Sequence, residues 1–142
     1  MAKLHGIEVP ATSLVTDRWP RPPVLAYPVN PFSSKVELIV DLTAERARRS
    51  GLTYAGKYPV ACQVQPDDFR IDVVRVVLGV TQVAEYAAFA AACFAAFQIP
   101  LMRVRTIVSC DAYHFSGTEP LPFRSLTQEE RRVIDEVGTW HA

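Results

Sequence analysis

This 142-residue chain lacks several features that would assign it to a class of proteins directly. Its three cysteines, Cys62, Cys93 and Cys110, cannot all pair, and their spacing fits no disulfide framework. Fifteen basic and fifteen acidic residues cancel, so no overall charge indicates nucleic acid or a membrane. Neither a glycine-rich phosphate loop nor a Gly-x-Ser-x-Gly elbow is present. The N-terminus has no apolar stretch typical of a secretory signal, and we expect a cytoplasmic protein.

Proline is concentrated near the N-terminus, where residues 1–34 hold six of the 11 prolines. Each proline fixes its own φ angle and biases the preceding residue away from helix. We therefore predict that residues 1–34 form an extended arm wrapped outside the body of the protein. Hydrophobic residues make up 49% and charged residues 21% of the chain, as in globular proteins. At this length we expect residues 35–142 to form one domain.

The segment Gln82–Phe97 (QVAEYAAFAAACFAAF) has the most distinctive composition. Alanine has the highest helix propensity, and no residue from Tyr86 to Phe97 is charged. We predict a core helix with most of its circumference buried. The segment is too short and too rich in alanine to span a membrane, which requires about 20 apolar residues. An alternative for the apolar face is a homodimer formed through Tyr86–Phe97.

Three segments are predicted to be strands of one small, mostly antiparallel sheet. In Val36–Val40, the residues Val36, Leu38 and Val40 alternate with Glu37 and with Ile39, which is the exception to the pattern. Tyr58–Gln63 is expected near a sheet edge because of Pro59. Leu101–Ser109 alternates apolar residues with arginines. Together with the alanine-rich helix, these strands predict an α+β fold.

Two further helices are predicted from end signals. One begins at Thr43 and ends at Gly51, which we expect in the left-handed conformation. The other is an amphipathic C-terminal helix that begins at a capping box of Thr127 and Glu130 and stops at Gly138. Phe69–Val80 is ambiguous: its valines fit one face of a helix, whereas its β-branched residues suit a strand. We favour the helix, and we expect Cys110–Pro122 to be a loop.

The candidate catalytic residues are Cys110, Asp111 and His114, which follow a predicted strand. A thiolate beside an imidazole is what nucleophilic catalysis requires, and an aspartate could orient the ring. This reading suggests a small hydrolase or transferase. The alternative is a cysteine packed inward at a strand end and an ordinary loop histidine. We expect no metal site, because the chain does not offer four nitrogen and sulfur ligands at paired spacings, and we expect no cofactor.

Arginines form the candidate binding residues. Arg46, Arg48 and Arg49 make a basic patch that Arg103 and Arg105 could extend, as contact with nucleic-acid phosphates would require. The alternative is a solvated helix face on which Glu45 pairs with Arg48 or Arg49. The neutral chain favours the solvated face.

The stretch Val40–Ala61 (VDLTAERARRSGLTYAGKYPVA) resembles an uncharacterised family of small proteins carried by bacterial plasmids and phages. The resemblance implies a mobile-element origin and an accessory or counter-defence role, but no activity and no site residues. We therefore expect a non-enzymatic protein that binds another macromolecule, most of all a protein.

Overall fold

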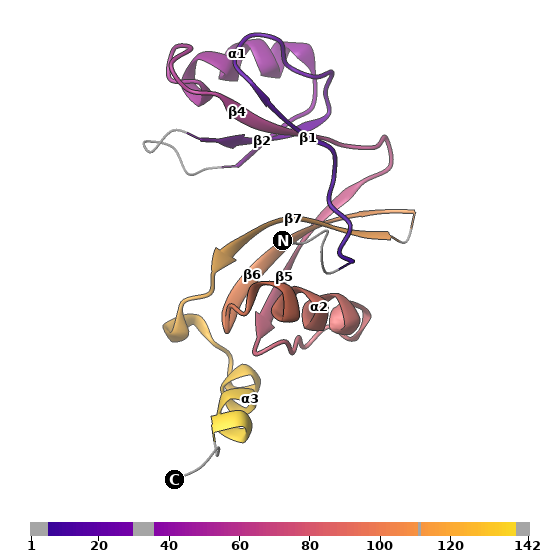
Figure 1. Ribbon diagram of the computed structural model, residues 1–142, viewed down its shortest axis with the longest axis vertical. Helices are drawn as coiled ribbons and strands as arrows, with labels where there is room; N and C mark the ends of the chain where they lie inside the picture. Colours follow the sequence, from indigo (N-terminus) through magenta and orange to yellow (C-terminus); the bar gives the residue numbers. More distant parts are fainter. Residues whose placement is uncertain (1–5, 30–35, 111, 139–142) are drawn as a thin grey trace. The chain divides into compact units, whose positions relative to one another are not determined.

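The structure is a computed structural model that describes residues 6–29, 36–110 and 112–138 (Figure 1). The chain forms two compact units: unit 1 comprises Met1–Val9 and Arg70–Ala142, and unit 2 comprises Pro10–Phe69. Each unit contains one antiparallel sheet, so the predicted α+β class is confirmed, with two sheets where one was expected. The predicted division into a 1–34 arm and a 35–142 domain concerns independent folding and stays a prediction.

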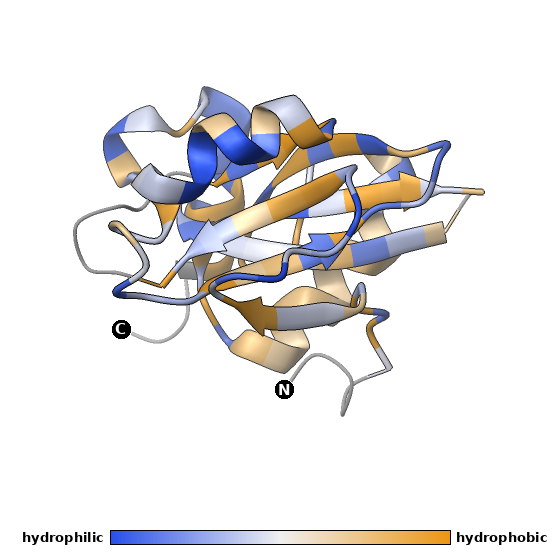
Figure 2. Ribbon diagram, turned by 90° about the horizontal axis from the view of Figure 1, so that it is seen from above, coloured by the Kyte–Doolittle hydropathy of each residue, from blue (hydrophilic) through white to orange (hydrophobic). Residues whose placement is uncertain are grey.

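Unit 2 is a four-stranded sheet with one helix. In spatial order the strands are β1 (Thr12–Val15), β4 (Val60–Val64), β2 (Val24–Pro28) and β3 (Glu37–Ile39), and the helix is α1 (Leu42–Leu52). Its core is a small apolar cluster that includes Val24, Ile39, Leu52 and Cys62. In Figure 2, α1 is coloured mainly as hydrophilic, as expected for a helix with one face in water.

The expectation that the segment 1–34 lies outside the body of the protein is wrong for residues 12–15 and 24–28, which form the strands β1 and β2 of this sheet. β2 pairs with both β3 and β4, and its residues Val24, Leu25 and Ala26 are buried. The prolines are tolerated because they fall before strands or at their ends, where a ladder N–H is not needed. The expected edge position of the Tyr58–Gln63 strand is also wrong: Pro59 precedes β4, which lies between β1 and β2.

In the strand predicted at Val36–Val40, the buried side chain is Ile39, the exception to the alternation. Ile39 is 1% exposed, whereas Leu38 and Val40 are 41% and 58% exposed. The strand has only three residues, and its register with β2 places Ile39 opposite the buried Val24. Pairing with a distant strand therefore decides which side chain points inward.

The predicted helix Thr43–Gly51 exists as α1, but its ends differ. Asp41, not Thr43, is the N-cap, since its Oδ1 accepts a 2.7 Å hydrogen bond from the Ala44 N–H. Gly51 lies inside the helix, and the left-handed residues follow at Tyr54, Ala55 and Gly56.

Unit 1 is built on a three-stranded sheet in the order β5 (Arg70–Val77), β6 (Leu101–Ser109) and β7 (Ala112–Pro120). A short 3-10 turn, η2 (Ala84–Tyr86), leads into α2 (Ala87–Phe97). A second 3-10 turn, η3 (Phe123–Ser125), precedes α3 (Gln128–Gly138). The strand predicted at Leu101–Ser109 is confirmed as β6.

Two predictions in this unit are wrong. Phe69–Val80 is not a helix: β5 alternates with a period of two, with Val74 and Val76 buried toward α2, and it pairs along its length with β6. Cys110–Pro122 is not a loop, because β7 occupies most of it and Tyr113 and Phe115 pack on the α2 core. Glycine, serine and proline are typical of loops, so the sequence of β7 by itself favours a loop. The segment is a strand because it pairs with β6.

The alanine-rich core helix is confirmed as α2. Phe89, Ala90, Cys93 and Ala96 are buried, and Phe97 packs against Phe115 of β7 with ring centroids 4.8 Å apart. We expected most of the helix surface to be buried, and in a single chain this expectation is wrong. Its exposed face consists of alanines, at positions 87, 88, 91 and 95. The predicted homodimer through this helix stays a prediction.

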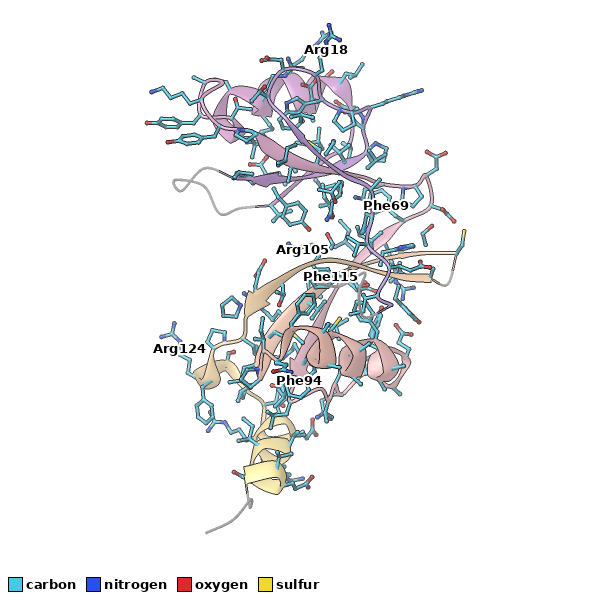
Figure 3. All side chains as sticks on the ribbon, viewed as in Figure 1. Arg18, Phe69, Phe94, Arg105, Phe115 and Arg124 are labelled. Carbon is cyan, nitrogen blue, oxygen red and sulfur yellow. The ribbon has the colours of Figure 1, made fainter. Side chains whose placement is uncertain are left out.

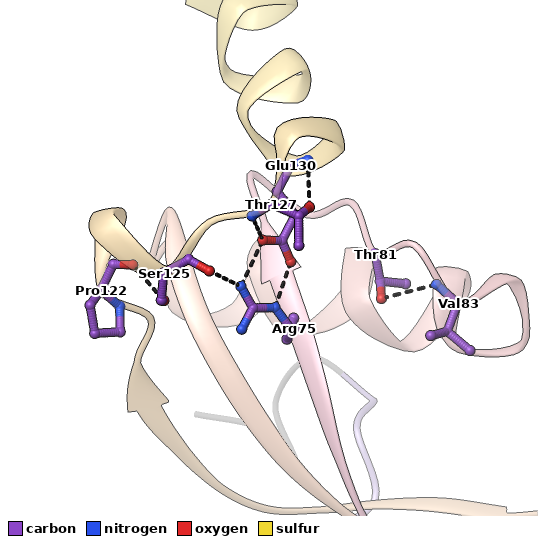
Figure 4. Close-up of polar contacts among 7 residues, drawn as sticks. All are labelled: Arg75, Thr81, Val83, Pro122, Ser125, Thr127 and Glu130. Atoms are coloured by element: carbon purple, nitrogen blue, oxygen red, sulfur yellow. Dashed lines mark hydrogen bonds and ion pairs between the residues drawn. The ribbon is translucent and has the colours of Figure 1, made fainter.

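The capping box predicted at Thr127 is confirmed, and it anchors α3 to the sheet (Figure 4). The Thr127 Oγ accepts from the Glu130 N–H at 3.2 Å, and the Glu130 carboxylate accepts from the Thr127 N–H at 2.8 Å. The same carboxylate forms a bidentate pair with Arg75 of β5, at 2.6 and 2.7 Å. This pairing holds the pKa of Glu130 below its usual value. No helix in the described part of the chain is long and apolar enough to cross a membrane.

Candidate functional site

Polar and aromatic side chains gather at one end of the sheet in unit 1. The ladder places Arg70 of β5 opposite Val108 of β6, and Val108 opposite Tyr113 of β7. The start of β5, the end of β6 and the start of β7 therefore meet at this end, and Tyr86 of η2 packs edge-on against Tyr113, with centroids 5.1 Å apart. We call this region the β6–β7 turn end.

A hydrogen-bonded cluster of Arg70, Asp72 and Tyr86 lies at this end. The Tyr86 hydroxyl donates to Asp72 Oδ2 and accepts from an Arg70 Nη at 3.1 Å. Arg70 Nε also donates to Asp72 at 2.8 Å, and its Nη lies 3.3 Å from Glu85. The three side chains fix η2, and hence the start of α2, to the first residues of β5.

The cluster sets the protonation states of its members. Hydrogen bonds from Tyr86 and Arg70 lower the pKa of Asp72, so the carboxylate stays charged. Burial, followed by the bond to Asp72, raises the pKa of Tyr86 to about 12. The hydroxyl is therefore held as a donor near neutral pH, and the cluster is a fixed, charged anchor rather than a proton-transfer centre.

Beside this cluster, an open groove follows the N-terminal segment Gly6–Val9. This segment hydrogen-bonds to β7, because the Phe115 N–H donates to the Glu8 carbonyl at 2.8 Å. The groove is lined by Gly6–Val9 and His114 and has a volume of about 470 Å³. His114 Nδ1 lies 3.3 Å from the Glu8 carboxylate, which is 68% exposed at the rim. The groove thus carries one carboxylate and one imidazole.

A second hollow of about 390 Å³ borders the same segment. Phe89 and Ala92 of α2 and Ala112 and Tyr113 of β7 line it together with Gly6, Ile7 and Glu8. Both hollows share Gly6–Glu8. The second hollow is lined partly by apolar and aromatic side chains, and the first carries a carboxylate and an imidazole. Small-molecule sites combine apolar and polar surfaces in this way.

Of the three predicted catalytic residues, Cys110 and His114 lie in the described part of the chain, and their joint role stays a prediction. Cys110 is exposed on the turn after β6 and is not among the described residues that line either hollow. His114 sits in β7 and faces Glu8. Asp111 lies outside the described residues, so the cluster is not tested as a unit. Among described residues, no group of three His, Cys, Asp or Glu side chains is placed to hold a metal ion.

The predicted arginine patch is paired with acidic residues in unit 2. Arg48 lies 3.5 Å from Glu37, and Arg49 pairs with the buried Glu45. Arg46 is exposed. In unit 1, Arg103 and Arg105 both contact Glu119, at 2.9 and 2.7 Å.

Sequence reasoning missed Arg70, Asp72, Tyr86 and Glu8. Asp72 had a usable signal: in a strand it shares a face with Val74 and Val76, and a carboxylate on an apolar face needs a partner. The helical reading of this segment hid that signal. Glu8 carried none, because only the fold brings residues 6–9 beside β7.

Comparison with known proteins identifies the family of the chain. The model of the RimK-like ATP-grasp N-terminal domain family matches residues 33–137. Because this match covers most of the chain, the chain belongs to that family. A comparison with curated proteins found no match.

Solved structures agree on the fold. A RimK-domain ATP-grasp protein from Sphaerobacter thermophilus is 18% identical with a TM-score of 0.63, over 96% of this chain and 60% of that one. A D-alanine–D-alanine ligase from Helicobacter pylori is 10% identical with a TM-score of 0.63, over 99% and 58%. A Bacillus anthracis D-alanine–D-alanine ligase complexed with ATP is 14% identical with a TM-score of 0.57, over 96% and 58%. The chain thus spans about three fifths of each.

These findings overturn two expectations. The resemblance of Val40–Ala61 to a plasmid and phage family is wrong, because that stretch lies inside the match to the RimK-like family. The expected non-enzymatic macromolecule-binding protein, with its hydrolase and nucleic-acid alternatives, is wrong for the same reason: the chain belongs to a family named for ATP-dependent enzymes. The predicted protein partner is not tested.

Proposed function

We propose that this chain acts as the N-terminal part of an ATP-dependent ligase that joins a carboxylate to an amine. The observation that carries the proposal is the family match over residues 33–137. The similarity in fold to D-alanine–D-alanine ligases, whose name describes the joining of two amino acids, supports the reaction type. The sequence has no glycine-rich phosphate loop, which is consistent with a part that does not itself hold the nucleotide.

Within this role, we infer that the groove beside Gly6–Val9 contacts the substrate. Its volume of about 470 Å³ lies in the range of small-ligand sites, roughly 300–1,000 Å³. Glu8 offers a carboxylate to a cationic amine, and His114 offers an imidazole beside it. The Tyr86 cluster holds η2 and Tyr113 in place next to the groove.

The test uses the ATP-binding portion of the enzyme with and without this chain. We expect ADP formation and an amide product, detected by mass spectrometry, only when the chain, a carboxylic acid and an amine are all present. Replacing His114 with alanine should raise KM for the amine at least severalfold and leave KM for ATP unchanged. Replacing the exposed Arg132 is the matched control. Product formation at the same rate without the chain would refute the proposed function.

A further inference from the structure

The face of the unit 1 sheet that points away from α2 carries three arginines. Arg75 of β5 and Arg103 of β6 are direct cross-strand neighbours, and Arg105 follows two residues later on β6. Arg105 projects on the side opposite Phe115 and α2 (Figure 3). Like charges directly opposite each other destabilise a sheet, so this arrangement needs compensation by anions.

Two carboxylates contact the three guanidinium groups. Glu130 is fully engaged by Arg75 and by the capping box, and Arg75 also donates to the Ser125 carbonyl at 2.8 Å. Glu119 of β7 is shared between Arg103 and Arg105, one oxygen to each, at 2.9 and 2.7 Å. Two cations therefore converge on a single carboxylate.

The Arg103 side chain has hydrogen-bonding capacity left over. Its Nε is buried and has no hydrogen-bond partner, although 42% of the side chain is exposed. A buried donor without a partner is costly, and more so when it carries charge. An oxyanion that took the place of the Glu119 carboxylate beside Arg103 would give this donor an acceptor.

The cross-strand neighbours of Arg105 suggest the shape of a ligand. The residue opposite Arg105 on β7 is Gly117, which has no side chain. The residue opposite Arg105 on β5 is Val73, which is 55% exposed and offers an apolar surface. Guanidinium groups match the planar geometry of a carboxylate, and Glu119 already shows a carboxylate bridging this pair.

We propose that Arg103 and Arg105 bind the carboxylate of a small ligand with a short apolar portion, and that the Glu119 side chain occupies this site in the unliganded chain. The proposal is separate from the ligase role, since it rests on a different face of the sheet. Ligand binding moves the Glu119 carboxylate aside and gives Arg103 Nε its missing acceptor.

The test is a titration of the full chain with glutarate, followed by nitrogen–proton NMR of the arginine Nε–H groups and by calorimetry. The Arg103 Nε–H signal should shift on binding. Arg103→Gln or Arg105→Gln should weaken binding about tenfold, since a hydrogen bond to a charged group is lost. Glu119→Gln should tighten binding roughly three- to tenfold, because it removes the internal competitor. Arg132→Gln, an exposed arginine on α3, should change nothing.

The sign of the Glu119→Gln effect separates the proposal from a purely structural ion pair, which would lose stability without gaining affinity. Melting temperatures show whether each variant is folded. If an arginine variant unfolds, the affinity of the Glu119→Gln variant for glutarate tests the proposal in its place. The proposal is overturned if glutarate fails to shift the Arg103 signal at millimolar concentration. It is also overturned if Glu119→Gln does not bind more tightly, or if inorganic phosphate binds as strongly as glutarate.

Discussion

The two compact units fasten their helices to their sheets by different means. In unit 2, α1 rests on a small cluster of short aliphatic side chains, and its buried Glu45 is neutralised within the helix by Arg49. In unit 1, α2 packs through aromatic rings, and α3 is attached by the Arg75–Glu130 pair between helix and strand. The Arg75–Glu130 pair of unit 1 is short and has a buried carboxylate, whereas the helix-to-strand pair of unit 2, Arg48–Glu37, is 3.5 Å long and mostly exposed on the arginine side.

The largest expected effects come from emptying each core separately. Met102 and Ile39 are 0% and 1% exposed and belong to the cores of unit 1 and unit 2. Met102→Ala and Ile39→Ala should each cost about 2–5 kcal/mol, because each leaves a cavity. Hydrogen exchange should accelerate mainly in the sheet that carries the substitution. Equal acceleration in both sheets would show that the two cores form one cooperative unit.

A smaller effect is expected from the polar attachment of α3. Glu130→Gln should destabilise the protein by about 2 kcal/mol, because Arg75 loses the charge on its partner. The pKa of Glu130 is lowered in the folded state, so its stabilisation is present above pH 4.5 and is lost as the pH falls through the lowered value. Urea unfolding should therefore show the two proteins converging in acid. Glu129→Gln, on the exposed side of α3, should have little effect at any pH.

The smallest effect concerns Tyr86. Tyr86→Phe should cost about 1.5 kcal/mol at neutral pH, since Asp72 and Arg70 each lose a hydrogen-bond partner. The folded protein also keeps the hydroxyl proton up to about pH 12, whereas an ordinary tyrosine loses it near pH 10. Stability should therefore fall as the pH rises from about 10 to about 12. The Phe variant should lack this alkaline loss, and Tyr54→Phe should retain it.

Elements with a strong local pattern could be predicted from the sequence. The composition of Gln82–Phe97, the alternation in Leu101–Ser109 and the capping box at Thr127 each depend on neighbours in the chain, and each prediction is confirmed. The failures share a physical cause. β2, β5 and β7 are specified by pairing with partner strands, and their own sequences carry a weak or ambiguous local signal.

The candidate site was predictable only in part. His114 and Tyr113 were in a segment singled out by its chemistry, and both line hollows at the β6–β7 turn end. Their partners Glu8 and Tyr86 come from segments about 106 and 27 residues earlier in the chain, and only the packing of unit 1 brings them together. The sequence cluster therefore indicated the lining residues that come from β7, and it indicated none of the residues that face them.

The three cysteine thiols differ in accessibility, and this difference allows one position to be labelled selectively with a fluorescent dye. Burial raises the pKa of Cys62 to about 11, with a contribution from Glu45, and that of Cys93 to about 12, and both side chains are inaccessible. Cys110 is exposed on the turn between β6 and β7. A maleimide dye added at neutral pH would therefore attach at that one position. Fluorescence of the wild-type sequence could then follow events at this end of unit 1 without any engineered cysteine.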